Sequence, residues 1–386
     1  MRRRDFILSS LALASTPAWA QDAPVSIGFL APLSGPYKSL GQQMVHAAQM
    51  AATEQKVTLC VEDTAGEPEG ALDAVNRLLA KKVAVAVGPV GVRESVTAAG
   101  WTVRQGLPLI SLCSDPTVLA NPLTIRWRLS PAEQGAQLAG LVEGKTVAIL
   151  APDSDFGRGA AEGFRVAWTA AGREVAREAY YPEEKPDFRR ALDEVTRTRR
   201  RIGVGETHQG KKADKLGYVS TGLSRLVDFD CLFIPDFHQR VSRILGFLPL
   251  VGIQNGEGGK GVAVQLLGLG GWRGRSMELT GAQAAGAIIL DTYGGVDDGG
   301  RAEEFERAYE SVAGHGATSF EAETFDAVWF AAEAARRQPD APTAGMRALM
   351  PWTGVAGTML RGKDGSLTRQ GRLFRFDVDG RVVPVG

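Results

Sequence analysis

The sequence has 386 residues with 44% hydrophobic and 23% charged residues, which is enough for two or three domains with their own cores. Its formal net charge is zero, so the composition excludes an intrinsically disordered chain and gives no support to a nucleic-acid-binding protein. Beyond the N-terminal segment, no apolar run is long enough to span a bilayer.

The N-terminus is typical of a bacterial export signal. A basic start at residues 2–4 precedes an apolar segment at 7–14 and an Ala-x-Ala cleavage pattern that ends at Ala20. Residues 3–8 resemble the twin-arginine export motif, and an ordinary secretory signal is the alternative. We therefore expect cleavage after Ala20 and a periplasmic mature chain that begins at Gln21.

The first segment of the mature fold is predicted to be a strand, a loop and a helix. An apolar run at 25–30 indicates a buried strand, a Pro- and Gly-rich loop follows at 32–41, and helical spacing begins at Met44. In open α/β sheets such a loop commonly holds a ligand, because unpaired N–H groups of the helix start point outward beyond the strand. A plain turn without a ligand is the alternative.

Strands and helices then alternate, which predicts parallel sheets with helices on both faces. A second α/β unit begins near Gly144. The predicted strands lie at residues 57–62, 83–87, 107–112, 146–150, 175–181, 231–234, 262–268 and 286–293, and the predicted helices at 70–81, 95–101, 160–171, 187–198, 239–250, 301–312 and 322–336.

Two further segments do not follow this alternation. The basic, Gly-containing stretch at 197–215 breaks the periodicity and is interpreted as a surface insertion, with a basic docking patch as the alternative. Near the C-terminus, residues 355–360 and 373–376 flank Asp364-Gly365, and a last hairpin turns at 379–380.

The sequence does not support catalysis or a metal site. The cysteines Cys60, Cys113 and Cys231 do not have zinc-ligand spacing, and the four histidines are scattered without a metal motif. No nucleophile, base and oxyanion group can be assembled from the motifs. We therefore expect a protein that is not an enzyme, with no cofactor, no metal and no catalytic residues.

The loops that follow the predicted strands carry a resemblance to a known family. Pro32-Leu33-Ser34-Gly35 with Gly41, and residues 354–358 with Asp364-Gly365, resemble motifs of the type I periplasmic binding proteins, the group of the Leu/Ile/Val-binding proteins. The resemblance implies an α/β fold with two Rossmann-like lobes, parallel sheets, three crossovers and a hinge. The crossovers are expected near residues 141, 289 and 352. The implied lobes are 24–141 with 290–350, and 142–289 with 351–386.

In this family, loops from both lobes line a ligand site between them. Carried over to this sequence, the implied ligand-binding residues are Leu40, Gly91, Val92, Arg93, Cys113, Ser114, Asp115, Phe156, Asp236, Phe237, Gly271 and Trp272. Asp115 and Trp272 are expected to face each other across the cleft, where Asp115 would pair with a donor and Trp272 would cover an apolar or cationic group.

The implied function is that of a periplasmic solute-binding component of an ABC importer. Gly270 stands where amino-acid-binding members place a carboxylate for the α-ammonium group, so the ligand is taken as a small polar metabolite such as an amino acid, an amide or a related compound. Its partners would be ABC permease membrane subunits, with no nucleic acid, and the protein would be a monomer. The alternative rests on residues 233–237 and 265–272, which resemble binding-protein-like activators of peptidoglycan synthases; it is a periplasmic scaffold that acts by protein contact.

Overall fold

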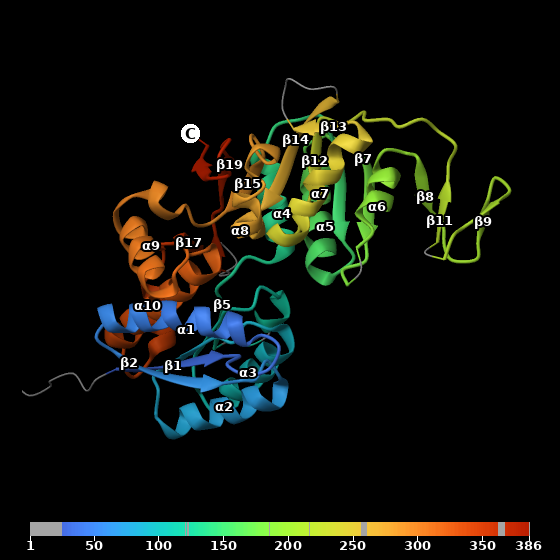
Figure 1. Cartoon of the computed structure of the whole chain (residues 1–386). Helices are drawn as coiled ribbons and strands as arrows, with labels where there is room; N and C mark the ends of the chain where they lie inside the picture. Colours follow the sequence, from blue (N-terminus) through green and yellow to red (C-terminus); the bar gives the residue numbers. More distant parts are fainter. Residues whose placement is uncertain are drawn as a thin grey trace, which may run out of the picture.

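The computed structural model describes residues 25–119, 121, 123–184, 186–215, 217–255, 261–361 and 367–385. The predicted export signal at residues 1–20 and the turn at Asp364-Gly365 lie outside the described residues. Figure 1 shows two α/β lobes, one formed by the N-terminal and late parts of the chain and the other by its middle part and its C-terminal end.

The first lobe is built on a five-stranded parallel sheet in the order β2-β1-β3-β4-β5. Its strands are β1 (Ser26–Ala31), β2 (Thr58–Asp63), β3 (Val85–Val87), β4 (Leu109–Ser111) and β5 (Thr124–Arg126). Its helices are α1 (Lys38–Glu54), α2 (Pro68–Ala80), α3 (Val92–Arg104), η1 (Pro116–Leu119), η5 (Gly295–Asp298), α9 (Gly300–Ala313), α10 (Ser319–Arg337) and α11 (Pro342–Ala348).

Helices cover both faces of this sheet, which explains its continuous apolar strands. Successive strand residues point to opposite faces, so Phe29 packs in the core with α1 and α10 while Leu30 packs in the core with α2 and α3. The predicted strands and helices of this part are confirmed, with boundaries shifted by a few residues.

The second lobe has a mixed sheet in the order β20-β19-β15-β14-β12-β6-β7, with β13 paired to β14. The strands from β7 to β15 run parallel, and β19 and β20 are antiparallel additions. These strands are β6 (Thr146–Pro152), β7 (Glu174–Tyr181), β12 (Cys231–Phe233), β13 (Ile253–Asn255), β14 (Val262–Leu269), β15 (Ile288–Asp291), β19 (Arg372–Phe376) and β20 (Val382–Pro384). The predicted last hairpin is confirmed as β19–β20.

Helices also cover both faces of the second sheet. One core contains α4 and α5, and the other contains α6 and α7. The helices of this lobe are α4 (Pro131–Leu141), α5 (Asp155–Ala170), α6 (Phe188–Val195), α7 (His238–Phe247), η2 (Leu248–Val251), η3 (Gly270–Trp272), α8 (Arg275–Glu278) and η4 (Gly281–Gln283).

Two of the predicted lobe boundaries need correction. Helix α4, expected in the first lobe, packs through Leu138 in the second-lobe core, so the first crossing lies at 127–130. The small antiparallel sheet expected in the second lobe instead packs in the first-lobe core through Trp352 and Met359. Its strands are β16 (Trp352–Gly354), β17 (Gly357–Arg361) and β18 (Leu367–Arg369). From the core in which each segment packs, we propose that the chain crosses between the lobes near residues 128, 292 and 370.

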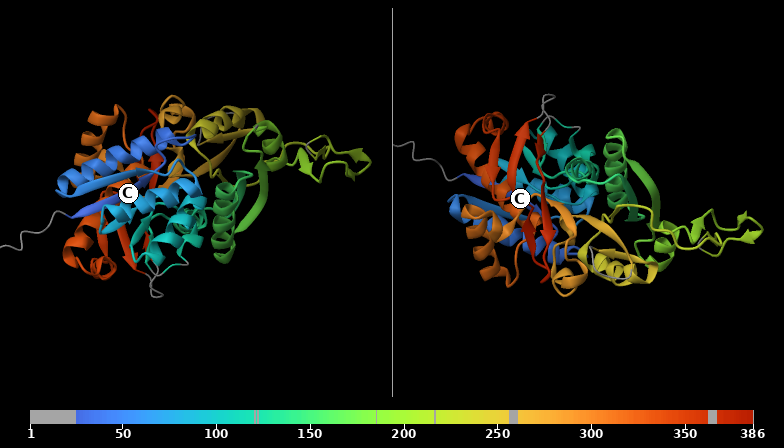
Figure 2. Two further views of the ribbon diagram at one scale, coloured as in Figure 1. Left: turned by 90° about the horizontal axis from the view of Figure 1, so that it is seen from below. Right: turned by 90° about the horizontal axis from the view of Figure 1, so that it is seen from above.

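The predicted surface insertion forms an extension that we call the basic arm, residues 197–222. It consists of two short antiparallel ribbons. The ribbons are formed by β8 (Arg199–Arg201) with β11 (Tyr218–Ser220), and by β9 (Thr207–His208) with β10 (Lys211–Lys212). Both views of Figure 2 show the arm extending well beyond the body of the second lobe.

Candidate functional site

The first predicted binding loop joins β1 to α1. A Cβ atom at Gly41 would lie 2.1 Å from the Pro32 carbonyl oxygen, so the helix can start this close to the loop only at a glycine. The Leu33 N–H donates to Asp63 Oδ1 at 2.8 Å and fixes the loop from inside the lobe. Leu40 is only partly exposed, because it packs against the first core.

The second loop follows β3 and begins α3. The Gly91 N–H donates to Glu94 Oε1 at 2.7 Å, and the Thr64 hydroxyl donates to Glu94 Oε2 at 2.5 Å. Val92 and Arg93 are exposed beside this fixed turn. Their contact with a ligand stays a prediction.

The third loop, residues 113–115, is more involved in the protein's own packing than expected. Cys113 is buried in the core with α2 and α3, and burial raises the pKa of its thiol. The Asp115 carboxylate accepts the Thr117 N–H at 2.8 Å and the Thr117 hydroxyl at 2.6 Å, so Asp115 forms an Asx turn into η1. Ser114 is half-buried between them.

Three predicted residues of the second lobe do come together. Phe156, at the start of α5, has its ring 5.1 Å from that of Phe237, at the end of the loop after β12. Gly271 lies against the same ring, since a Cβ there would be 3.0 Å from Phe237 Cδ1. Phe237 is 42% exposed, so the pair presents an accessible aromatic surface at the carboxyl edge of the sheet.

Asp236 has a structural role that its position in the sequence did not indicate. Its side chain is fully buried and accepts hydrogen bonds from the Tyr181 hydroxyl and from Arg240 Nε, the latter at 2.7 Å to Oδ2. Burial raises the pKa of the Tyr181 hydroxyl, and the neighbouring Asp236 adds to this effect. With its oxygens engaged in this way, Asp236 supports the loop that positions Phe237.

The prediction that Trp272 faces Asp115 across the cleft is wrong. Trp272 is fully buried in the second-lobe core, and its indole N–H donates to the Ile234 carbonyl oxygen at 2.9 Å. A Cβ at Gly268 would lie 2.3 Å from the indole ring, so this glycine makes room for Trp272 to fold onto β14. A side chain held in this way cannot cover a ligand.

Sequence analysis missed a set of buried charges at the three crossings. At the first crossing, Arg128 Nε donates to Glu323 Oε2 at 2.6 Å, and its guanidinium lies 4.5 Å from the centre of the Phe320 ring. The Thr292 hydroxyl, at the second crossing, donates to the other oxygen of Glu323 at 2.9 Å. Glu323 on α10 therefore connects two of the three segments that join the lobes.

Asp291 forms a second buried centre beside the second crossing. Its carboxylate accepts Arg273 Nε at 2.7 Å and the Thr292 N–H at 2.7 Å, and it is hydrogen-bonded to Ser319 of α10. Burial raises the pKa of the Asp291 carboxyl, with the Arg273 guanidinium acting against this rise. The end of β15 is thereby tied to the first-lobe helix α10.

The third crossing is held by a fully buried ion pair. Asp326 Oδ2 lies 3.3 Å from Arg369 Nη1, and the side chains are 1% and 0% exposed. Next to this pair, the Gln137 side chain donates to the Arg369 carbonyl oxygen at 2.9 Å and accepts the Gly371 N–H at 2.8 Å. Glu323 and Asp326 lie on α10 together with other acidic residues, Glu321 and Glu333, so the sequence alone does not mark them as crossing residues.

Arg126 and Glu133 clamp the first crossing with two parallel hydrogen bonds of 2.7 and 2.8 Å. Ser130 and Glu133 also form the capping box that starts α4. Burial alone would raise the pKa of Glu133, but hydrogen bonds from Arg126 and Ser130 outweigh it, so the pKa lies below its ordinary value of 4.5.

The clamp predicts a specific loss of stability in acid. A depressed carboxylate pKa stabilises the fold above about pH 4.5, and this contribution is lost as the pH falls through the lower folded-state value. Because the Glu133 side chain is 38% exposed, we expect an effect of no more than about 1 kcal/mol. Urea unfolding from pH 6 to pH 3 should show a shallower decline for Glu133→Gln than for the parent. Parallel declines would contradict the assignment.

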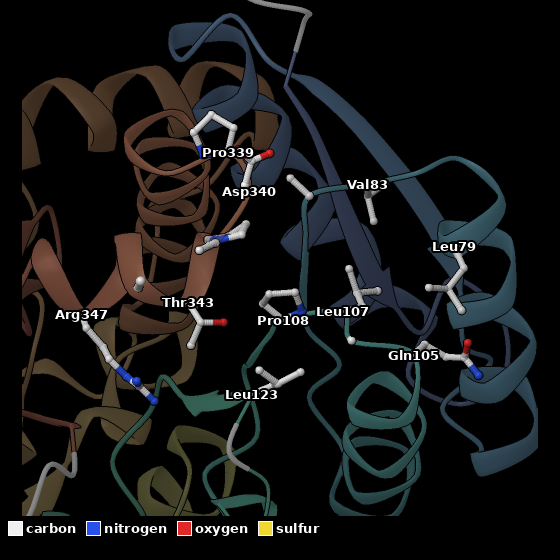
Figure 3. A pocket seen from close by; sticks show the side chains of 15 residues that line it. Leu79, Val83, Gln105, Leu107, Pro108, Leu123, Pro339, Asp340, Thr343 and Arg347 are labelled. Carbon is white, nitrogen blue, oxygen red and sulfur yellow. The ribbon is translucent and has the colours of Figure 1, made fainter.

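The structure also has an open groove at the opposite edge of the first sheet, with a volume of about 620 Å³. Figure 3 shows its lining, where Val83, Leu107 and Leu123 come from segments that precede β3, β4 and β5, and Pro339 and Thr343 come from the α10–α11 region. None of the predicted ligand-binding residues lines it. It therefore lies apart from the carboxyl-edge loops.

No helix within the described residues is long and apolar enough to cross a membrane. No group of three or more His, Cys, Asp or Glu side chains in the same ranges is placed to hold a metal ion.

Comparison with known proteins gives the following matches. Residues 24–199 match the periplasmic binding protein family. The Leu/Ile/Val-binding protein BraC3 from Rhizobium johnstonii is 29% identical over 203 residues, which are 47% of this chain and 53% of that protein. A Leu/Ile/Val-binding protein homologue from Brucella melitensis biotype 1 is 28% identical over 201 residues, 47% of this chain and 54% of its own. The chain thus spans about half the length of the curated relatives it matches.

Solved structures resemble the whole described fold. An ABC transporter substrate-binding protein from Sphaerobacter thermophilus has a TM-score of 0.74 at 19% identity, covering 94% of this chain and 97% of its own. The isoleucine complex of the branched-chain amino acid transporter substrate-binding protein LivJ from Streptococcus pneumoniae has a TM-score of 0.68 at 18% identity, with 94% and 99% covered. A benzoate complex of a solute-binding protein from R. palustris has a TM-score of 0.68 at 15% identity, with 94% and 96% covered. These likenesses confirm the two-lobed α/β fold.

Proposed function

We propose that the chain is a type I periplasmic binding protein of the Leu/Ile/Val-binding type and that it acts as the solute-binding component of an ABC importer. The family match over residues 24–199 and the curated relatives agree with the family predicted from the loop motifs, and they support a binding protein that is not an enzyme. The ligand, the permease partner and the monomeric state are parts of this proposal.

The observation that carries the proposal is the Phe156–Phe237–Gly271 cluster. Loops from three strands of the second sheet bring these residues together at its carboxyl edge, where ligands gather in parallel sheets. An exposed aromatic pair supplies a surface for the apolar part of a small solute. The exposed start of α3 in the first lobe, with Arg93, would hold the polar or anionic end.

The three proposed crossings support the same proposal. Ion pairs lie at each of the three segments that we propose join the two sheets. Lobes connected only through such segments can close on a ligand by small changes in backbone torsion angles. We propose a small polar metabolite with an apolar portion as the ligand. Relatives or structural neighbours are named for Leu/Ile/Val, isoleucine and benzoate.

Thermal-shift measurements with branched-chain amino acids, their amides and small aromatic acids test the proposal. A ligand present at about 100 times its dissociation constant should raise stability by about 2.7 kcal/mol. Phe237→Ala should lower the affinity for the ligand found in this way by about tenfold, because the aromatic contact is lost. The control is Leu279→Ala, which changes a side chain that is 83% exposed in the same lobe.

If Phe237→Ala and Leu279→Ala bound the ligand with equal affinity, the ligand site would lie away from Phe237. The absence of a shift with every compound would contradict the importer proposal and favour the alternative, a scaffold that regulates a peptidoglycan synthase by protein contact.

A further inference from the structure

The basic arm carries a local excess of positive charge in a chain whose formal net charge is zero. Residues 197–222 contain seven Arg and Lys against Glu206 and Asp214, a formal charge of +5, whereas the whole chain has a net charge of zero. The match to the periplasmic binding protein family ends at residue 199, where β8 begins. Residues 200–222 of the arm, which include Arg200, Lys211 and Lys212, thus lie beyond the matched region.

The base of the arm is firmly attached to the second lobe. The Tyr218 hydroxyl donates to the Tyr180 carbonyl oxygen at 3.1 Å, and Tyr218 and Val219 are buried. Asp214 lies 3.2 Å from Arg190 of α6 and 3.3 Å from Arg199 of β8. One of the two acidic residues of the arm is therefore used to hold its base.

The outer part of the arm, residues 203–212, presents a different set of side chains. Lys211 and Lys212 are exposed there, and Arg200 is exposed on β8 next to it. Val204 is 73% exposed in a turn. The segment contains no Phe, Tyr, Trp, Met or Leu, so it has none of the apolar anchors that protein interfaces usually bury.

We propose that the basic arm is a docking surface for an anionic phospholipid membrane. Anionic lipids attract Lys and Arg only within about 10 Å of the surface, because salt screens the field beyond this distance. A membrane is flat, so a projecting segment can bring its cations this close while the rounded lobes remain outside the field. Figures 1 and 2 show such a projection, with the arm leading away from both lobes.

The composition of the outer arm favours lipid over an acidic protein partner. Lysine is depleted in the cores of protein–protein interfaces but provides the favourable charge at membrane surfaces. The exposed Val204, in the same outer part of the arm as Lys211 and Lys212, can enter the headgroup region without leaving a large apolar patch in water. Docking would keep the protein near the membrane independently of any ligand.

Sedimentation with vesicles tests this inference. The full chain should bind vesicles of phosphatidylglycerol mixed into phosphatidylcholine, should not bind phosphatidylcholine alone, and should be released when salt rises from about 0.05 M to about 0.5 M. The triple variant Arg200→Gln, Lys211→Gln, Lys212→Gln should bind at least about tenfold more weakly, since each cation near the surface contributes.

A matched control removes the same charge from the body of the protein. The triple variant Arg104→Gln, Arg275→Gln, Arg337→Gln changes three exposed cations outside the arm and should retain the parent's affinity for the vesicles. Equal losses in both triple variants would overturn the assignment to the arm. No binding to the anionic vesicles, or equal binding to both vesicle types, would overturn the lipid proposal, and an acidic protein surface would then be the occupant to examine.

Discussion

Replacing Asp326 with alanine is expected to lower the free energy of unfolding by about 3–5 kcal/mol, because it leaves one member of a buried ion pair without its partner. Asp326 and Arg369 are 1% and 0% exposed, so the guanidinium would remain charged in the interior. The carboxylate also accepts the N–H groups of Val355 at 2.8 Å and Ala356 at 2.9 Å. Alanine would deprive both backbone donors of their acceptor.

Urea unfolding followed by circular dichroism measures this loss. Glu310→Ala, which removes an exposed carboxylate from α9, is the control and should change stability by less than about 0.5 kcal/mol. Adding Arg369→Met to Asp326→Ala should recover part of the loss, because the unpaired charge is removed as well. If Asp326→Ala were as stable as Glu310→Ala, the buried pair would not be what holds the third crossing.

The order of strands and helices could be predicted because both lobes bury both faces of a sheet. Such strands are short apolar runs, as at Phe29 and Leu30, and helices lie between them with recognisable spacing. The loop motifs were also informative, since glycines such as Gly41 occur where two backbones come close. Local features of this kind can be recognised from the sequence alone.

The assignment of segments to lobes was less predictable, because it depends on contacts distant in the sequence. Helix α4 directly follows the first sheet, yet it packs on α5, where a Cβ at Gly135 would lie 2.2 Å from the Ala160 carbonyl oxygen. Val355 likewise packs with the first-lobe core although β19 follows it in the second lobe. The apolar stripe of a helix, or a short apolar strand, does not indicate which of the two lobes the segment will pack in.

The buried charges at the crossings could not be predicted for a different reason. Arg, Asp and Glu are usually exposed, so Arg128 and Glu323 would be assigned to the surface by default. The burial of Glu323 and the partial burial of Arg128 depend on a pairing that only the three-dimensional structure provides. The same holds for Asp236, whose partners Tyr181 and Arg240 come from β7 and α7.

Trp272 is the position where the sequence was most misleading. Its loop is rich in glycine and follows a strand, which favours a ligand site, and tryptophan is a good stacking residue. The glycine at 268, however, leaves the space into which the indole folds. The predicted ligand lid is therefore a core residue, and its replacement should affect stability first.

Trp272→Ala is accordingly expected to lower the free energy of unfolding by about 3–5 kcal/mol, through lost burial and the cavity left behind. It would also leave the Ile234 carbonyl oxygen without its indole donor. Phe237 lies in the same region but is 42% exposed, so Phe237→Ala should lower the free energy of unfolding much less and should mainly weaken ligand binding. Urea unfolding of the two variants without ligand distinguishes these effects. A Trp272→Ala protein as stable as the parent, with weakened binding, would mean that the indole turns toward the ligand and that the buried position is not the one occupied in solution.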